Sequence, residues 1–286
     1  MTGWRPLLAA VLAMTVVQVG ACGEKGAVPR IERDLPYHDG VSADVHVPAA
    51  GGAVPVIVTL HGCCGGKHDL TALANRLATE GAVVFNASWR SDTGANGYPE
   101  AYERAACAVR FARAQAPRYG GDPLKVTVVG WSDGALLAAV VANAGQDFSG
   151  GCRAASAQSD ADAVVTLGGF LGWPVPEGGL IDPLLVNQRT TEFFSGSPEE
   201  AAHAWTAGNP YVHLGRRPHV EIRLVVAEQD ALLEDNRRFA EAARQAGHPV
   251  SLIVTPAGGH QTIVAPRTPE GATAVQEILG AARRRT

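Results

Sequence analysis

Short apolar, β-branched runs alternate with segments of helically spaced apolar residues along most of the chain. The runs that predict strands are Val41–Val47, which alternates as a half-exposed strand does, Val54–Leu60, Ala82–Asn86, Lys125–Gly130, Ala163–Leu167, Val220–Ala227 and Val250–Thr255. Helical spacing is found in Asp69–Glu80, Tyr98–Gln115, Ala135–Ala144, Leu232–Gln245 and Thr268–Arg284. Strands that alternate with helices form parallel crossovers, so we expect an α/β fold with one mostly parallel central sheet and helices on both faces.

Length and composition fit one large domain. The chain has 286 residues, 46% of them apolar, and a formal net charge of −4 without a basic block, which argues against a nucleic-acid partner. We expect the domain to span 40–286. Its one irregular stretch, 168–218, is rich in Gly, Pro and Trp and is either a cap over a pocket or a plain surface excursion.

The N-terminus predicts the compartment. Leu7–Val19 is an apolar run of about 13 residues, which is short for a membrane span. The small residues Val19-Gly20-Ala21 precede Cys22, and this pattern resembles the lipobox of bacterial lipoproteins. The resemblance implies that 1–21 is a signal peptide, that Cys22 is the acylated mature N-terminus and that 22–39 is a linker. The alternative is an ordinary cleaved signal peptide. Both place the mature protein outside the cytoplasm, either anchored to a membrane through the lipid or secreted.

Four further cysteines can form disulfides in that compartment, with three connectivities open. We favour Cys107 with Cys152, because Cys107 lies in one predicted helix and Cys152 follows another that can lie beside it. Cys63 and Cys64 are neighbours, and they are either free or joined by a strained vicinal bridge. No cysteine or histidine spacing predicts a metal site, and we expect no cofactor.

The strongest chemical motif is Gly130-Trp131-Ser132-Asp133-Gly134. It matches GxSxG between a predicted strand and a predicted helix, the context in which a sharp turn presents a serine nucleophile above the sheet. The helix N-terminus also offers N–H groups and a positive dipole to developing negative charge. The alternative is a tight glycine turn whose serine caps the helix.

A serine nucleophile needs a base, and the base needs a carboxylate that orients it, in the chain order Ser, acid, His. Asp230 follows the predicted strand Val220–Ala227, and His260 lies in the glycine-rich loop after the last predicted strand. Both lie at carboxyl ends of strands, where open α/β sheets bind ligands. The competing acids are Glu228, Glu234 and Asp235.

His61-Gly62-Cys63-Cys64-Gly65-Gly66 directly follows the predicted strand Val54–Leu60. With Tyr98-Pro99 and the run Tyr119–Pro123, it makes residues 40 to 265 similar to α/β-hydrolase esterases, specifically the feruloyl-esterase-related, hormone-sensitive-lipase-like group. The resemblance implies an oxyanion hole made by the backbone N–H groups of Cys63 or Cys64 and of Asp133. For His61 itself we favour a role in holding this loop by hydrogen bonds, and the alternative is acid–base work.

Two residues depart from that pattern. Cysteines stand at 63 and 64 where the family has glycines, and their Cβ atoms restrict the loop. Asp133 replaces a small or neutral residue, and its carboxylate either repels an oxyanion or faces solvent on the first helical turn. Four tryptophans either line the pocket or pack in the core, and for Trp89 and Trp205 we favour the core. They are Trp89, Trp131, Trp173 and Trp205.

These features predict a secreted or lipid-anchored serine hydrolase that cleaves small carboxylic esters through an acyl-enzyme on Ser132. The alternatives are acyl transfer or peptidase chemistry on the same three residues, and a non-catalytic binding lipoprotein on a hydrolase fold. The sequence leaves the acyl and alcohol groups and the oligomeric state open.

Overall fold

The computed structural model describes residues 28–49, 51–153, 158–174 and 185–284, together with Met1. The predicted signal peptide beyond Met1 and the acylation site Cys22 lie outside these ranges. Within them, no helix is both long and apolar enough to span a bilayer.

The centre of the molecule is an eight-stranded sheet in the order β1-β2-β4-β3-β5-β6-β7-β8. Its strands are β1 (Arg30–His38), β2 (Val41–Val47), β3 (Val54–Leu60), β4 (Val83–Ala87), β5 (Gly121–Trp131), β6 (Ala163–Leu167), β7 (Glu221–Ala227) and β8 (Val250–Thr255). The β1–β2 and β2–β4 pairs are antiparallel and all the others are parallel. The expected mostly parallel sheet is therefore confirmed.

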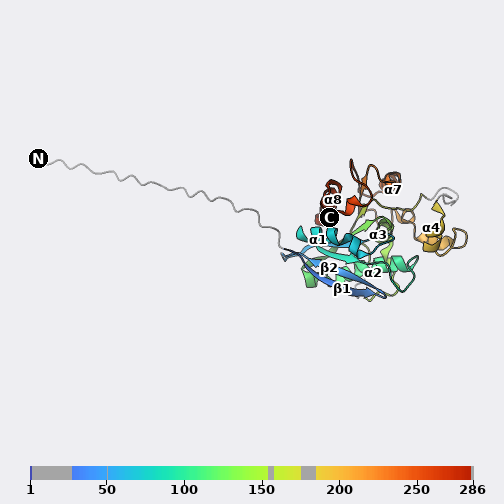
Figure 1. Cartoon of the computed structure of the whole chain (residues 1–286), viewed down its shortest axis with the longest axis horizontal. Coiled ribbons are helices and arrows are strands. Elements are labelled where there is room, and N and C mark those ends of the chain that lie inside the picture. Colours follow the sequence, from blue (N-terminus) through green and yellow to red (C-terminus); the bar gives the residue numbers. More distant parts are fainter. Residues whose placement is uncertain (2–27, 50, 154–157, 175–184, 285–286) are drawn as a thin grey trace.

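Helices cover both faces of the sheet (Figure 1). They are α1 (Thr71–Thr79), α2 (Glu100–Gln115), α3 (Asp133–Ala144), α4 (Gln188–Phe193), α5 (Ala202–Ala207), α6 (Pro210–His213), α7 (Leu233–Gln245) and α8 (Pro269–Arg283). Short 3-10 helices are η1 (Lys67–Leu70), η2 (Ala116–Tyr119), η3 (Gly145–Asp147) and η5 (Thr262–Val264). One core cluster contains buried residues of α2, α3 and α7, and the other contains those of α1 and α8. The sheet is thus buried on both sides, as a parallel sheet requires.

Strand β1 corrects the expectation of a linker over 22–39. It pairs with β2 at the edge of the sheet, and most of its residues are exposed or half-buried. The register shifts between Glu32 and Leu35 and again between Pro36 and His38. A charged edge strand with irregular register carries little hydrophobic alternation, which is why the pattern did not predict it.

Strand β2 is buried, in contrast to the half-exposed strand that its alternation predicted. Its apolar side chains enter one core cluster, while the polar ones are covered on the other face. His46 hydrogen-bonds Asn75 of α1 through Nδ1, at 2.8 Å, and Asp44 pairs with Lys67 of η1 at 2.5 Å. The alternation therefore separates two buried faces, one of them polar and internally paired.

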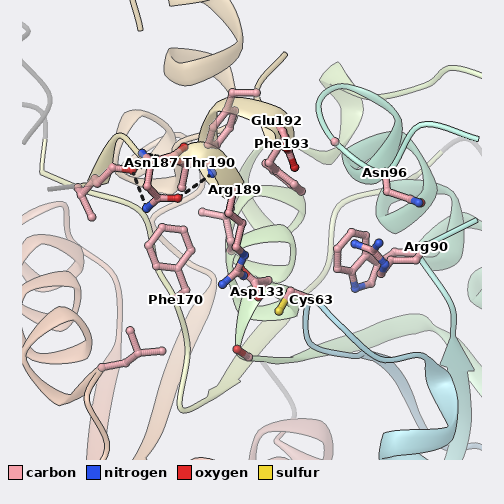
Figure 2. A pocket seen from close by; sticks show the side chains of 17 residues that line it. Cys63, Arg90, Asn96, Asp133, Phe170, Asn187, Arg189, Thr190, Glu192 and Phe193 are labelled. Carbon is pink, nitrogen blue, oxygen red and sulfur yellow. Dashed lines mark hydrogen bonds and ion pairs between the residues drawn. The ribbon is translucent and has the colours of Figure 1, made fainter. Parts of the chain in front are cut away.

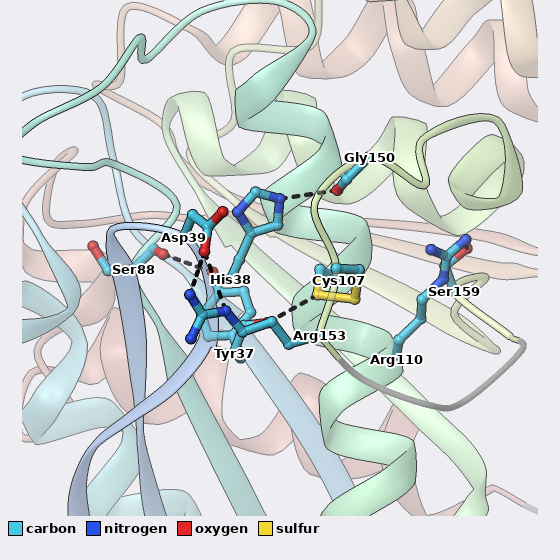
Figure 3. Close-up of a disulfide and its surroundings, with 10 residues drawn as sticks. Tyr37, His38, Asp39, Ser88, Cys107, Arg110, Gly150, Arg153 and Ser159 are labelled. Atoms are coloured by element: carbon cyan, nitrogen blue, oxygen red, sulfur yellow. Dashed lines mark hydrogen bonds and ion pairs between the residues drawn. A yellow bond between two sulfur atoms is a disulfide. The ribbon is translucent and has the colours of Figure 1, made fainter.

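A disulfide joins Cys107 of α2 to Cys152, the pairing favoured from the sequence (Figure 3). Nearby, His38 Nε2 donates to the carbonyl of Gly150 at 2.9 Å, and Arg153 pairs with Asp39. These contacts fasten the segment after η3 to α2 and to the β1 end of the sheet. Cys63 and Cys64 are free thiols.

Candidate active site

Ser132 occupies the sharp turn between β5 and α3. Its φ of 55° and ψ of −121° lie in a region that L-residues rarely adopt. Added Cβ atoms on the flanking glycines would meet backbone oxygens, that of Gly134 at 2.2 Å for Gly130 and that of Leu60 at 2.2 Å for Gly134. Both glycines are therefore required, because α3 begins in direct contact with β5 and with the end of β3.

The structure brings His260 and Asp230 to this serine. The Ser132 hydroxyl donates to His260 Nε2 at 3.0 Å, and His260 Nδ1 donates to Asp230 Oδ2 at 3.0 Å. Because β5, β7 and β8 are parallel, the turns that follow them open at the same edge of the sheet. The three residues, which follow one another in the chain order Ser, acid, His, are thereby joined by hydrogen bonds from Ser132 through His260 to Asp230.

Asp230 is the acid that reaches the histidine. Its side chain is 2% exposed, and its second oxygen accepts the backbone N–H of Leu232 at 3.0 Å. Burial acts to raise the pKa of Asp230, but the hydrogen bonds from His260 and Leu232 outweigh burial and lower it. Of the competing acids, Glu228 is exposed, and Glu234 and Asp235 pair with arginines of their own helix.

Two features that the sequence did not predict help to position Asp230 and His260. Gly168, at the end of β6, has a φ of +48°, and a Cβ there would lie 2.7 Å from Asp230 Oδ2 and 3.2 Å from His260 Nδ1. Trp131 Nε1 donates to the backbone carbonyl of His260 at 2.9 Å. A glycine directly after a buried strand was the available sequence signal for the first contact. The second depends on chain segments far apart in sequence.

The loop after β3 lies against the serine. A Cβ on Gly62 would be 3.3 Å from Ser132 Cβ, and Cys63 lines the same cavity as Ser132, whereas Cys64 is exposed and does not. The two thiols hydrogen-bond each other at 2.8 Å. Burial, this hydrogen bond and the charge of Asp133 raise the pKa of Cys63 to about 12, so its thiol is neutral.

His61 is buried and fastens this loop. Its Nδ1 donates to the carbonyl of Gly62 at 2.8 Å, and its ring stacks on Trp89 at 5.2 Å between centroids. Trp89 Nε1 in turn donates to the carbonyl of His61 at 2.7 Å. Burial lowers the pKa of His61 to about 4, so the imidazole is neutral at pH 7. A neutral, hydrogen-bonded histidine is suited to positioning the loop.

Asp133 faces the cavity, and the alternative that it faces solvent is wrong. Its side chain is 12% exposed, and its Oδ1 pairs with Arg189 of α4. Figure 2 shows the two side chains together beside Cys63. Arg189 thus balances the charge of the Asp133 carboxylate, which the sequence analysis considered as a possible source of repulsion toward an oxyanion.

The cavity above Ser132 measures about 410 Å³, a size suited to a small organic ligand. The described part of segment 168–218 contributes much of its wall. The lining residues from the described part of that segment are Phe170, Leu185, Asn187, Arg189, Thr190, Glu192, Phe193 and Phe194. Helix α4 lies at one end of the molecule, away from α1 and α8 (Figure 1).

The tryptophans divide between core and cavity. Trp205 packs against Trp173 and Phe194 in the core, as expected for Trp205. Trp89 is 1% exposed and yet also lines the cavity. Trp131 is buried in the core cluster that α1 and α8 cover. The described residues hold no group of three or more His, Cys, Asp or Glu side chains arranged to bind a metal ion.

Comparisons with known proteins agree with this architecture. The family model described as BD-FAE matches residues 43–173. Carboxylesterase NlhH of Mycobacterium tuberculosis is 26% identical over 260 residues, which cover 81% of this chain and 75% of that protein. Among solved structures, the propionate-bound esterase 2 of Thermogutta terrifontis has a TM-score of 0.68 at 22% identity, covering 91% of this chain and 93% of that chain. A truncated carbohydrate esterase from gut microbiota has a TM-score of 0.73 at 17% identity, covering 91% and 99%. The family match, the carboxylesterase relative and the fold together support an α/β-hydrolase of the serine esterase type.

Proposed function

We propose that the protein hydrolyses carboxylic esters through an acyl-enzyme on Ser132. The observation that carries this proposal is the line of hydrogen bonds from Ser132 Oγ through His260 to Asp230, with both distances at 3.0 Å. The carboxylesterase relative supports the same reaction class. A small-molecule ester is the substrate that a cavity of about 410 Å³ above the serine would admit.

In this mechanism, Asp230 accepts the Nδ1–H of His260 and so leaves Nε2 free to take the serine proton. Ser132 Oγ attacks the ester carbonyl, and the tetrahedral oxyanion accepts the backbone N–H of Asp133 and that of Cys63. His260 then protonates the leaving alcohol. A water molecule, activated by the same imidazole, hydrolyses the acyl-enzyme and restores Ser132. Each oxyanion donor contributes about 3 kcal/mol in the transition state.

Labelling with a fluorophosphonate probe tests the nucleophile. We expect wild type to be labelled and Ser132→Ala to be unlabelled, with kcat for p-nitrophenyl esters lower by roughly 10⁴-fold or more. Ser195→Ala is the matched control, because Ser195 also has a positive φ, of 63°, and lies outside the cavity lining. Labelling of the Ser132→Ala protein, or no labelling of folded wild type, would contradict the proposal.

We further propose that segment 168–218 is a cap over the cavity.

We also propose that Cys22 is acylated and that the enzyme acts outside the cytoplasm. The Cys107–Cys152 disulfide supports an oxidising compartment. Membrane fractionation after expression in a bacterium tests the anchor. Wild type should sediment with membranes and carry a fatty-acyl label, whereas Cys22→Ser should do neither. Soluble, unlabelled wild type would instead favour an ordinary secreted enzyme.

A further inference from the structure

Arg90 lines the cavity above Ser132 and has an unusual environment for an arginine. Its guanidinium lies over the Trp89 ring, 5.5 Å from the centroid. Among the described residues, none forms an ion pair with it or accepts a hydrogen bond from its side chain. Its charge is therefore held in place by an aromatic face while its N–H donors are left for a ligand.

The aromatic platform is rigid. Trp89 is fully buried, its Nε1 donates to the carbonyl of His61, and its ring stacks on the His61 ring. The guanidinium held over this ring lines the cavity, and its planar fork of N–H donors matches the two oxygens of a carboxylate. Because the arginine side chain is already ordered, it loses less conformational entropy when a ligand binds.

The acidic groups of the cavity are engaged elsewhere. Asp133 pairs with Arg189 on α4, and Glu192 Oε1 accepts a hydrogen bond from Gln188 at 2.8 Å. Arg90 is therefore the charged group of the described cavity wall that lacks a protein partner. With Asp133 balanced by Arg189, the remaining charges of the described lining are those of Arg90 and Glu192, and this balance favours a single negative charge on the ligand over a dianionic group such as a phosphate.

The position of Arg90 relates it to the reacting centre. Figure 2 shows Arg90 and Asn96 on one side of the cavity, Phe170 on the other, and Cys63 and Asp133 between them. Cys63 and Asp133 flank the place where the ester carbonyl would lie in the proposed mechanism. An ester seated there extends one end toward Arg90 and the other toward Phe170.

We propose that Arg90 selects esters that carry a carboxylate, and that it binds this carboxylate at the end of the cavity opposite Phe170. This inference rests on the proposed ester hydrolysis and names the substrate class of the same site. The carboxylate belongs either to the acyl part or to the alcohol part of the ester, and two substrate pairs distinguish them. The acyl pair is 4-nitrophenyl hemiglutarate and 4-nitrophenyl pentanoate. The alcohol pair is 4-carboxyphenyl butyrate and phenyl butyrate.

The measured quantity is the ratio of kcat/KM for the charged ester to that for its neutral partner. In one of the two pairs, Arg90→Gln should lower this ratio at least about tenfold, mainly through KM, which is the scale of one charge-assisted hydrogen bond. Arg90→Lys should retain part of the preference because it keeps the charge and loses the planar fork. Arg237→Gln, an exposed arginine of α7 outside the cavity, should leave the ratio unchanged.

Two further measurements separate this inference from the proposed function. Calorimetric binding to the Ser132→Ala protein requires no turnover. Its ligand is monomethyl glutarate if the acyl pair shows the preference and 4-carboxyphenyl butyrate if the alcohol pair does, and binding should weaken about tenfold when Arg90→Gln is added. The charged-to-neutral ratio of wild type should also fall in 0.5 M salt, even if the Arg90 variants fail to fold. Turnover with equal ratios in wild type and Arg90→Gln for both pairs would overturn the carboxylate site alone. No turnover of any ester by folded wild type would overturn the proposed function.

Discussion

Gly168 shows how closely a single residue limits the active-site geometry. At φ +48°, its missing side chain leaves room for Asp230 Oδ2, which a Cβ would approach to 2.7 Å. In Gly168→Ala, the added methyl would push the carboxylate off the imidazole. A misplacement of this kind costs roughly a hundredfold in kcat. Steady-state kinetics with a p-nitrophenyl ester would measure the loss.

Gly81→Ala controls for backbone strain in that experiment. Gly81 also has a positive φ, of +93°, but no atom lies within 4 Å of the place that a Cβ would occupy, and the residue is outside the cavity lining. Both substitutions should lower the free energy of unfolding by about 1–2 kcal/mol, because each places a side chain in the left-handed region. Only Gly168→Ala should lose activity. Equal kcat values for the two variants would show that Gly168 has no part in holding the acid.

At the scale of single residues, the sequence predicted those whose role is indicated by their immediate neighbours or by their order along the chain. Ser132 was marked by its two glycines, and Asp230 and His260 by their places after strands. Gly168 had only the signal of a glycine directly after a buried strand, and Arg90 had no local pattern, because their roles depend on which side chains the folded chain brings against them. Asp133 was recognised as unusual, but its counter-ion Arg189 lies on a short helix in the stretch where periodicity is weakest.

Among the elements, the contact of α4 with the start of α3 bears directly on the reaction. Arg189 of α4 pairs with Asp133, the residue after the nucleophile. Arg189→Gln would leave the Asp133 charge unbalanced beside the developing oxyanion. We expect kcat/KM to fall by about fivefold, since Arg189 is 60% exposed and solvent screens the pair.

A double variant isolates that electrostatic effect. Adding Asp133→Asn removes the charge that Arg189 balances, so Arg189→Gln should cost less in this background than in wild type. Stopped assays at low and high ionic strength would give the same comparison by screening. If Arg189→Gln costs as much in the Asp133→Asn background as in wild type, then α4 acts by shaping the cavity and its charge is immaterial.

Element prediction succeeded where both faces of an element are apolar or clearly amphipathic. The bounds of β2, β3, β6 and β8 agree with the predicted runs, and helices α3, α7 and α8 differ from theirs by a residue or two at an end. Strand β1 was not predicted because it is a charged edge strand. Helices α4 to α6 were not predicted because helices of only one or two turns show no hydrophobic period. Their positions are set by contacts with the rest of the fold, such as the 2.7 Å hydrogen bond from Tyr98 N to Phe193 O.

For the whole molecule, the parallel sheet assembles the site and the buried histidines tie its stability to pH. Burial lowers the pKa of His61 from 6.5 to about 4. Between these values the unfolded chain binds a proton that the folded protein excludes, so stability falls as pH decreases from 6.5 to 4. His61 alone contributes about 3 kcal/mol across this interval, taking 1.36 kcal/mol for each pH unit. His46, His213 and His248, whose pKa values burial also lowers, act in the same direction.

Urea unfolding at pH 7 and at pH 4.5 measures this dependence. The charges that act on His61 are Asp69, which opposes the lowered pKa, and Arg90 and His68, which reinforce it. In His61→Asn, the stability difference between the two pH values should shrink, because a titrating group that the fold keeps neutral has been removed. The exposed His203 serves as the control, and His203→Asn should keep the wild-type difference. An unchanged difference in His61→Asn would mean that the loop around the oxyanion hole admits a charged imidazole, and that His61 does not hold it as a neutral hydrogen-bond donor.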